Sequence, residues 1–264
     1  MTARDTAATV NNEVNGRDFY DQIYQRDLEQ EAEWSRLTAL QKVRSVATLM
    51  RRAGFSPQSL LEVGCGTGAV IRECKRLALA ETFSAIDYST TALHYLSAAD
   101  PAIRTLRADI TSEDFRWDKP VDGIICSHVI EHLEEPRTFL SALRSRIDFK
   151  FAVFEVPLEN LVGHKWRWRG RDRKANSAGH VQFFTSQSFE ALLLRNGYRI
   201  LARRRYVPRL SLETIRFVTD RQHLTMGGQL RKVVTNNVLP RLTAPVWSRL
   251  YYGHYATLCT KAGV

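Results

Sequence analysis

The sequence predicts an α/β fold built on a doubly wound, seven-stranded sheet. An apolar run at residues 60–63 leads into glycines at positions 64, 66 and 68 and then into a helical segment. A second apolar run ends at Asp87, about 20 residues further on, which is the spacing at which doubly wound nucleotide folds bind a ribose diol. Two later apolar runs also end in polar residues, and ligands bind at the carboxyl ends of strands in open α/β sheets.

The N-terminal region precedes this sheet. Residues 1–15 are polar and lack the apolar core of a secretory signal, so we expect a disordered leader and a cytoplasmic protein. Residues 17–52 indicate two helices, the second with an apolar stripe at three-to-four spacing, and Gly54 ends it. We therefore divide the chain into the leader, a helical cap (16–54) and a main domain (55–264).

The glycine loop is suited to close approach of a ligand. Glycine adopts a positive φ without strain and has no Cβ to block the amide groups at the following helix N-terminus. The spacing differs from the Gly-x-Gly-x-x-Gly dinucleotide fingerprint, and Glu62 lies two positions before the first glycine. An ordinary strand-to-helix turn is the alternative, and the register of Asp87 and Asp109 favours the ligand site.

The third and fourth predicted strands also end in polar residues. Residues 103–107 lead into Asp109 and Ile110, although Asp109 alone would also suit the N-cap of a helix. Residues 121–126 lead into the segment Ser-His-Val-Ile-Glu-His-Leu at 127–133.

The remaining strands are separated by two insertions. We expect strands at 151–156, 198–206 and 255–261, the first ending at Pro157, and a helix from Thr185 or Ser186 to Asn196 with Gly197 at its end. The insertions occupy residues 158–182 and 207–254.

Residues 60–136 resemble a class I S-adenosylmethionine-dependent methyltransferase, since the glycine loop and the strand-end aspartates occur in that family's order. The Val-Ile-Glu-His-Leu segment is similar to the small-molecule branch, which includes quinone and natural-product methyltransferases. The resemblance implies a Rossmann-like fold, S-adenosylmethionine as cofactor, and insertions that form a lid on the substrate side.

The resemblance also assigns roles to individual residues. In that family the glycine loop accommodates the methionine part of the cofactor, the acidic residue after the second strand binds the ribose, and an aspartate after the third contacts the adenine. The expected cofactor-binding residues are Glu62, Gly64, Cys65, Gly66, Gly68, Asp87, Tyr88, Asp109, Ile110 and His128. N-terminal helices cap the pocket in the family, so Tyr20 and Tyr24 are candidate substrate residues. The alternative is that both pack with Phe19 against the core.

Histidines are the candidate catalytic residues. The methyl sulfonium is already activated, so the enzyme must align the acceptor and remove a proton from a hydroxyl or ammonium group. His128, His132 and His180 are the candidates, and for each the alternative is a hydrogen-bonded structural histidine. Glu155 would hold a substrate amine, orient a histidine or pair with Arg167.

The first insertion alternates cations with aromatic residues. The candidate substrate-binding residues there are Lys165, Trp166, Arg167, Trp168 and Arg169. From residue 158 onward the chain has 19 Lys and Arg against 5 Asp and Glu, within a net charge of +10. Three explanations of this positive charge are ranked: an acidic or amphiphilic small-molecule substrate first, a solvated face second and RNA third. RNA is last because no Asn-Pro-Pro-Tyr base-flipping signature follows the fourth strand.

The second insertion contains more apolar residues than a simple loop. As helices it would form a lid over an apolar acceptor, a homodimer surface, or a basic amphipathic patch on anionic lipid, and we favour the lid. No apolar run reaches the ~18 residues of a membrane span. Four cysteines show no paired metal spacing, so we expect no metal. Three of them fall inside predicted core elements, and we expect these three to be buried reduced thiols.

Taken together, these features predict methyl transfer to the oxygen or nitrogen of a small or medium acceptor that is acidic or amphiphilic, in biosynthetic metabolism. Two alternatives stay open. One is carbon methylation of a prenyl or polyketide-like acceptor. The other is a non-catalytic, cofactor-binding scaffold whose basic half docks an anionic partner.

Overall fold

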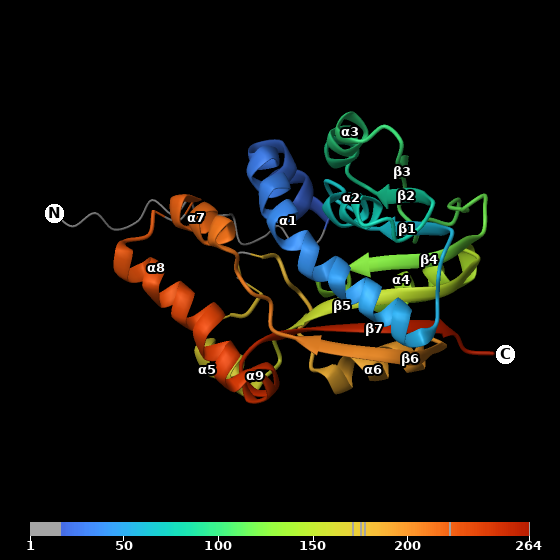
Figure 1. Ribbon diagram of the computed structural model, residues 1–264. Coiled ribbons are helices and arrows are strands. Elements are labelled where there is room, and N and C mark those ends of the chain that lie inside the picture. Colours follow the sequence, from blue (N-terminus) through green and yellow to red (C-terminus); the bar gives the residue numbers. More distant parts are fainter. Residues whose placement is uncertain (1–16, 171, 175, 177, 222, 264) are drawn as a thin grey trace.

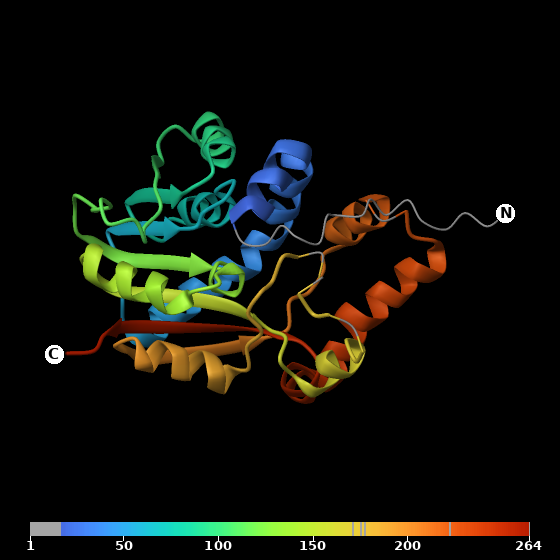
Figure 2. The same ribbon diagram turned by 180° about the vertical axis from the view of Figure 1, so that it is seen from behind.

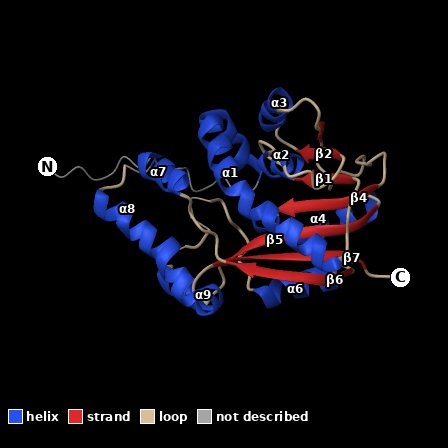
Figure 3. Ribbon diagram, viewed as in Figure 1, coloured by secondary structure: helices blue, strands red, loops and turns tan. Residues whose placement is uncertain are grey.

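A seven-stranded sheet with helices on both faces forms the body of the protein (Figures 1 and 3). The computed structural model describes residues 17–170, 172–174, 176, 178–221 and 223–263, so the expected leader lies outside the described residues. The strands are β1 (Ser59–Val63), β2 (Thr82–Asp87), β3 (Arg104–Arg107), β4 (Val121–Ser127), β5 (Phe149–Leu158), β6 (Tyr198–Tyr206) and β7 (Gly253–Lys261). The helices are α1 (Arg17–Ala53), α2 (Ala69–Arg76), α3 (Thr90–Ala99), α4 (Pro136–Arg146), α5 (Val162–Arg167), α6 (Ser186–Arg195), α7 (Leu212–Arg221), α8 (Met226–Val233) and α9 (Leu239–Leu250).

The strand order is β3-β2-β1-β4-β5-β7-β6. The first five of these strands are parallel, and β7 is antiparallel to both β5 and β6. From β1 the chain adds β2 and β3 on one side of the sheet and then continues with β4 and β5 on the other side. In open α/β sheets the ligand crevice forms at such a switch point, here between β1 and β4. This confirms the predicted doubly wound α/β fold.

Helix α1 begins beside the carboxyl ends of the parallel strands and runs across one face of the sheet toward their amino ends (Figure 1). A non-helical residue, Asp27, divides it into two helical segments, in agreement with the predicted pair. The second segment buries Val43, Val46 and Leu49 in the core. Gly54, at φ +74°, then ends the helix.

Strand β5 is longer than the sequence predicts, because it continues through Pro157 to Leu158. The pairing of β5 with β4 ends at Glu155 opposite Ser127, whereas the antiparallel pairing with β7 continues and places Pro157 opposite His254. Proline lacks an N–H donor and is therefore tolerated where a strand has lost one neighbour. The expected end at Pro157 was wrong for this reason.

The second insertion is helical. Helices α7, α8 and α9 extend away from the sheet, and a π-helical turn, Val234–Val238, joins α8 to α9 (Figures 1 and 2). The first insertion contains the short helix α5 and is otherwise irregular in the residues described. No helix in the described ranges combines the length and apolarity that crossing a bilayer requires.

Candidate active site

A cavity of about 990 Å³ lies at the carboxyl ends of β1, β2 and β4 and is bordered by α1. Its wall includes most of the glycine loop together with Glu62, Asp87 and Tyr88. The same wall includes His128, His132 and His180, and, from α7, Phe217, Val218 and Arg221. The fold thus brings most of the expected cofactor residues and all three candidate catalytic histidines to one cavity.

The glycine loop adopts the conformation that its sequence requires. Gly64, Gly66 and Gly68 have φ values of +74°, +52° and +76°. A Cβ on Gly64 would collide with the side chain of Val129, and one on Gly66 would lie 2.5 Å from Tyr24 Oη. Only glycine fits these positions without strain.

Asp87 ties this loop to the end of β2. Its Oδ2 accepts a hydrogen bond from the Gly66 N–H at 2.7 Å, and its Oδ1 accepts one from the Ser89 N–H at 2.9 Å. The carboxylate is buried but lies on the cavity wall. Since each carboxylate oxygen has two lone pairs, Asp87 can still accept hydrogen bonds from a ligand's hydroxyl groups.

Glu62 supports the loop from below. Its Oε2 accepts a hydrogen bond from the Ile71 N–H, in the first turn of α2, at 2.9 Å. Burial raises the pKa of Glu62 to about 8. The glycines of this loop leave room for a ligand, and the carboxylate of Asp87 lies at the end of β2. Together they fit a nucleoside ligand with a ribose diol, as S-adenosylmethionine has.

Two tyrosines of α1 face the cavity. Tyr24 is buried with its hydroxyl over Gly66, and the Tyr20 hydroxyl lies 3.0 Å from His132 Nε2. His132 Nδ1 lies 3.1 Å from the carbonyl oxygen of Gly179, so Nδ1 carries the proton and Nε2 accepts from Tyr20. Burial lowers the pKa of His132 to about 4, which keeps the ring neutral.

His180 has a different partner. Its Nδ1 lies 2.6 Å from Glu159 Oε2, and its ring packs edge-on against His132 with centroids 4.8 Å apart. Burial by itself would lower the pKa of His180, but the hydrogen bond and negative charge of Glu159 outweigh burial and raise it. The Nδ1–H···carboxylate bond leaves Nε2 as the proton-accepting atom of the neutral ring. Tyr20, His132, His180 and Glu159 thus form a first cluster.

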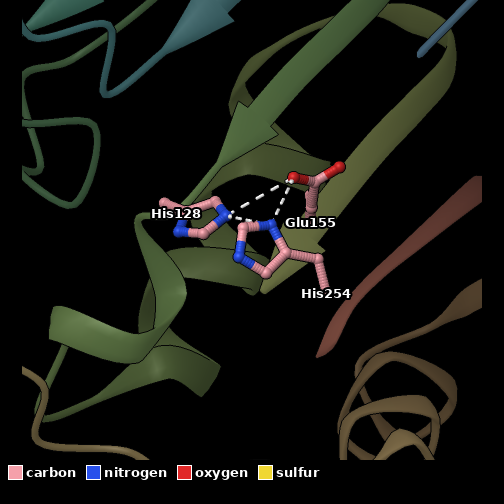
Figure 4. A group of neighbouring side chains, drawn as sticks. All are labelled: His128, Glu155 and His254. Carbon is pink, nitrogen blue, oxygen red and sulfur yellow. Dashed lines mark hydrogen bonds and ion pairs between the residues drawn. The ribbon is translucent and has the colours of Figure 1, made fainter. Parts of the chain in front are cut away.

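A second cluster consists of His128, Glu155 and His254, which lie just after β4, on β5 and on β7 (Figure 4). His128 follows β4 with φ +58°, a region that non-glycine residues rarely occupy. Its Nε2 lies 3.4 Å from Glu155 Oε1 and 3.2 Å from His254 Nδ1, and the latter two atoms are 3.4 Å apart. Tyr206 donates a hydrogen bond to Glu155 Oε1 at 2.9 Å.

The ionisation of this cluster follows from burial and hydrogen bonding. Burial would raise the pKa of Glu155, but hydrogen bonds to His128 and His254 hold it well below its usual range. Burial, followed by repulsion from His128, lowers the pKa of His254 to about 4. Glu131, fully buried and 3.3 Å from His128 Nδ1, has its pKa lowered to about 2 by His128 in spite of burial.

Some predicted residues lie elsewhere. Asp109 accepts hydrogen bonds from the N–H and the hydroxyl of Thr111 in a turn, so it is not the N-cap of a helix. Thr111 lines the cavity, whereas Asp109 and Ile110 are not among the residues that line it. Gly68 packs against Leu96. In the first insertion, Lys165, Trp166, Trp168 and Arg169 lie outside the described cavity wall, and the side chain of Arg167 lies outside the described residues.

Four residues that form or contact these two clusters were not among the residues predicted from the sequence. These are Glu131, Glu159, Tyr206 and His254. Glu131 was part of the Val-Ile-Glu-His-Leu segment, but no local pattern singled out the other three. Their partners are far away in the sequence, for example the 48 positions between Tyr206 and His254.

Comparison with known proteins agrees with this geometry. Residues 25–203 match the family model described as "Methyltransferase domain". Malonyl-[acyl-carrier protein] O-methyltransferase of Halalkalibacterium halodurans is 30% identical over 102 residues, which are 36% of this chain and 37% of that protein. The mitochondrial ubiquinone biosynthesis O-methyltransferase of Schizosaccharomyces pombe is 30% identical over 98 residues, 35% of each chain. The chain thus spans about a third of these relatives.

A solved structure extends the similarity in fold. The N-methyltransferase NodS of Bradyrhizobium japonicum, in complex with S-adenosyl-L-homocysteine, superposes with a TM-score of 0.55 at 14% identity, covering 93% of this chain and all of that one. At this identity the likeness shows a common fold.

Proposed function

Because this chain belongs to the family of S-adenosylmethionine-dependent class I methyltransferases, we propose that it methylates an oxygen or nitrogen of a small or medium acceptor that is acidic or amphiphilic. The observation that carries this proposal is the shared cavity, whose wall combines the glycine loop and Asp87 with the histidines.

The residues of the chain divide the work of transfer between them. S-adenosylmethionine, when bound, supplies a methyl group already activated on sulfur. The glycine loop and Asp87 would hold the methionine and ribose portions, and Tyr24 would border them. The acceptor then has to be aligned and deprotonated by residues across the cavity.

We assign the general base to His180. Its Nδ1 is held by Glu159 at 2.6 Å, so Nε2 can accept a proton while Glu159 stabilises the resulting imidazolium. His132 is a weaker base because its pKa is about 4 and its Nε2 already accepts from Tyr20. We therefore give His132 a positioning role beside the base.

The basic C-terminal half of the chain supports an acidic acceptor, since residues 158–264 hold 19 Lys and Arg against 5 Asp and Glu. The cavity wall itself carries both signs of charge: four cations, Arg26, Lys42, Arg221 and Lys232, and five acidic residues, Glu31, Glu62, Asp87, Glu134 and Glu135. Arg221 lies on α7 and pairs with Glu31 of α1 at 3.5 Å, while Arg36 of α1 contacts Glu213 of α7. These ion pairs connect α7 to α1, and α7 also buries Ile215 and Val218. We therefore take α7 as one wall of a lid over the acceptor.

An apolar stripe on the second insertion supports an amphiphilic acceptor presented at a lipid surface. Its residues follow one another at four-residue spacing along α8, the π-helical turn and α9, where such neighbours lie on adjacent turns. They are Met226, Leu230, Val234, Val238, Leu242, Val246 and Leu250, all exposed except the half-buried Val234. Residues 221–264 contain six Lys and Arg and no Asp or Glu, which suits an anionic bilayer. The names of the two curated relatives favour oxygen as the methylated atom.

The experiment is an acceptor screen that measures S-adenosyl-L-homocysteine release. Carboxylated, phosphorylated and lipid-linked molecules are offered with S-adenosylmethionine, and the pH dependence of kcat/KM is then recorded with the best acceptor. The base works deprotonated, so the wild-type rate should rise with pH through a midpoint above about 6.5, the ordinary histidine value.

Variants of the base pair decide the assignment. In Glu159→Gln, the pKa of His180 loses the largest of the effects that oppose burial, so the midpoint should move to lower pH. His180→Asn should lower kcat by about 10²–10⁴-fold. His94→Asn on the exposed face of α3 is the matched control and should leave the profile unchanged. An unchanged rate in His180→Asn would overturn the base assignment, and no turnover on any acceptor class would favour the scaffold alternative.

A further inference from the structure

The three atoms at the centre of the His128–Glu155–His254 cluster have the spacing of ligands around one ion. The distances between His128 Nε2, Glu155 Oε1 and His254 Nδ1 are 3.2, 3.4 and 3.4 Å. Bonds of ~2.0–2.1 Å in a tetrahedral zinc site place neighbouring ligand atoms about 3.3–3.4 Å apart. The octahedral geometry of Mg²⁺ requires about 3.0 Å instead. The triangle therefore matches a four-coordinate site.

The outer nitrogen of each ring lies near an oxygen atom. His128 Nδ1 is 3.3 Å from Glu131 Oε1, an ion-pair contact with a carboxylate, and His254 Nε2 is 3.1 Å from the Tyr252 hydroxyl. If the outer nitrogens carry the protons, the inner nitrogens present their lone pairs to the same point as Glu155 Oε1. Such outer contacts fix the tautomer and orientation of a ligating imidazole.

Two buried carboxylates also belong to the cluster or contact it. Glu131 and Glu155 are almost completely buried, and within the part of the chain that the structure describes their ion pairs are with histidines alone. Glu155 Oε2 is buried with no hydrogen-bond partner in the same residues. Buried carboxylates of this kind are found paired with cations or bound to metals.

We propose that His128, Glu155 and His254 bind a divalent transition-metal ion of the zinc type, with the Tyr206 hydroxyl beside the fourth position. Two histidines and one carboxylate are a ligand set that zinc uses when one position stays open. Tyr206 Oη lies 2.9 Å from Glu155 Oε1 and 3.2 Å from His254 Nδ1, so it contacts two of the three ligand atoms. Because His128 also lines the cavity, the ion would fix one residue of the methyl-transfer site.

The test uses the full-length protein after treatment with a chelator. Zn²⁺ is titrated by calorimetry, and Co²⁺ is added as a spectroscopic probe, since tetrahedral Co²⁺ has visible absorption bands far stronger than those of octahedral Co²⁺. We expect one ion per chain and a tetrahedral Co²⁺ spectrum. In His254→Asn and Glu155→Gln the affinity should fall at least about 100-fold, and in Glu131→Gln about 10–100-fold.

Two controls localise the ion. His180→Asn removes a histidine from the neighbouring group of Glu131, His132 and His180, whose ligand atoms also lie close together, and His94→Asn removes an exposed one. Both should keep wild-type affinity. Circular dichroism identifies any variant that fails to fold, and the wild-type Co²⁺ spectrum tests the geometry without a variant.

Two results would overturn the proposal. One is wild-type protein that binds neither ion, and the other is binding that survives His254→Asn but is lost in His180→Asn. Neither cofactor nor acceptor takes part in the titration, so its failure would leave the proposed methyl transfer standing.

Discussion

Replacing Asp87 should weaken both the fold and the cofactor site, by an amount that follows from its two hydrogen bonds. The buried carboxylate accepts from the Gly66 N–H at 2.7 Å and from the Ser89 N–H at 2.9 Å. A hydrogen bond to a charged group contributes about 1.5–3 kcal/mol, so Asp87→Ala should lower the free energy of unfolding by about 3–6 kcal/mol. In a chain of this length, each kcal/mol corresponds to roughly 2–4 °C in Tm.

Asp87→Asn separates binding from stability, because its amide oxygen preserves one acceptor. We expect a smaller fall in Tm and about a 10–100-fold loss of affinity for S-adenosyl-L-homocysteine, measured by calorimetry, since the ribose hydroxyls lose a charged acceptor. Asp118→Asn is the matched control, because Asp118 is exposed and pairs with Arg104 at 3.0 Å. If Asp87→Ala has a wild-type Tm and Asp87→Asn has wild-type affinity, the cofactor site has been placed wrongly.

Three further predictions concern the glycine loop, its buried carboxylate and the apolar stripe. Gly68→Ala should lower the free energy of unfolding, measured in urea, by about 2–5 kcal/mol, because the new Cβ adds a collision with Leu96 to the strain of a positive φ. Gly170→Ala is the control, with a similar φ and open space around it, and should cost about 1–2 kcal/mol. Equal effects of the two substitutions would refute the packing argument. Because the pKa of Glu62 is about 8 in the folded protein and about 4.5 in the unfolded chain, its protonated carboxyl contributes stability that is complete below pH about 4.5 and is lost as pH rises through about 8. Glu62→Gln should therefore flatten the pH dependence of Tm. An unchanged pH dependence in this variant would contradict the prediction. Leu242→Glu should weaken sedimentation with anionic vesicles at least about tenfold, whereas Leu194→Glu, exposed on α6, should not; equal sedimentation of both variants would exclude the stripe from lipid contact.

The sheet and the cofactor loop were predictable because their signals are local. Apolar runs that end in polar residues located the strands to within a few residues, and Thr185 and Gly197 marked the ends of α6, where the structure has a capping box and a φ of +78°. The glycines needed only their own spacing to indicate positive φ. The boundary of β5 was missed because tolerance of Pro157 depends on which neighbouring strand has already ended.

The two histidine clusters could not be predicted, since their geometry depends on contacts between distant segments. His254 meets His128 across 126 positions. It lies on β7, which begins at Gly253, whereas the sequence analysis assigned position 254 to the second insertion. The basic segment of the first insertion gave a strong local signal, yet Lys165, Trp166 and Arg169 are exposed and outside the described cavity wall. Alternating charge and aromatic residues indicate chemistry, but they do not say where the chain will place them.

A crystal structure of the full-length protein with S-adenosyl-L-homocysteine would test the central claim most directly. We predict that the ligand lies in the cavity, with its ribose hydroxyls on Asp87, its amino-acid portion along Gly64 and Gly66, and its sulfur facing the side of the cavity that carries His128 and His180. A ligand bound elsewhere, or a cavity that excludes it at saturating concentration, would contradict the account.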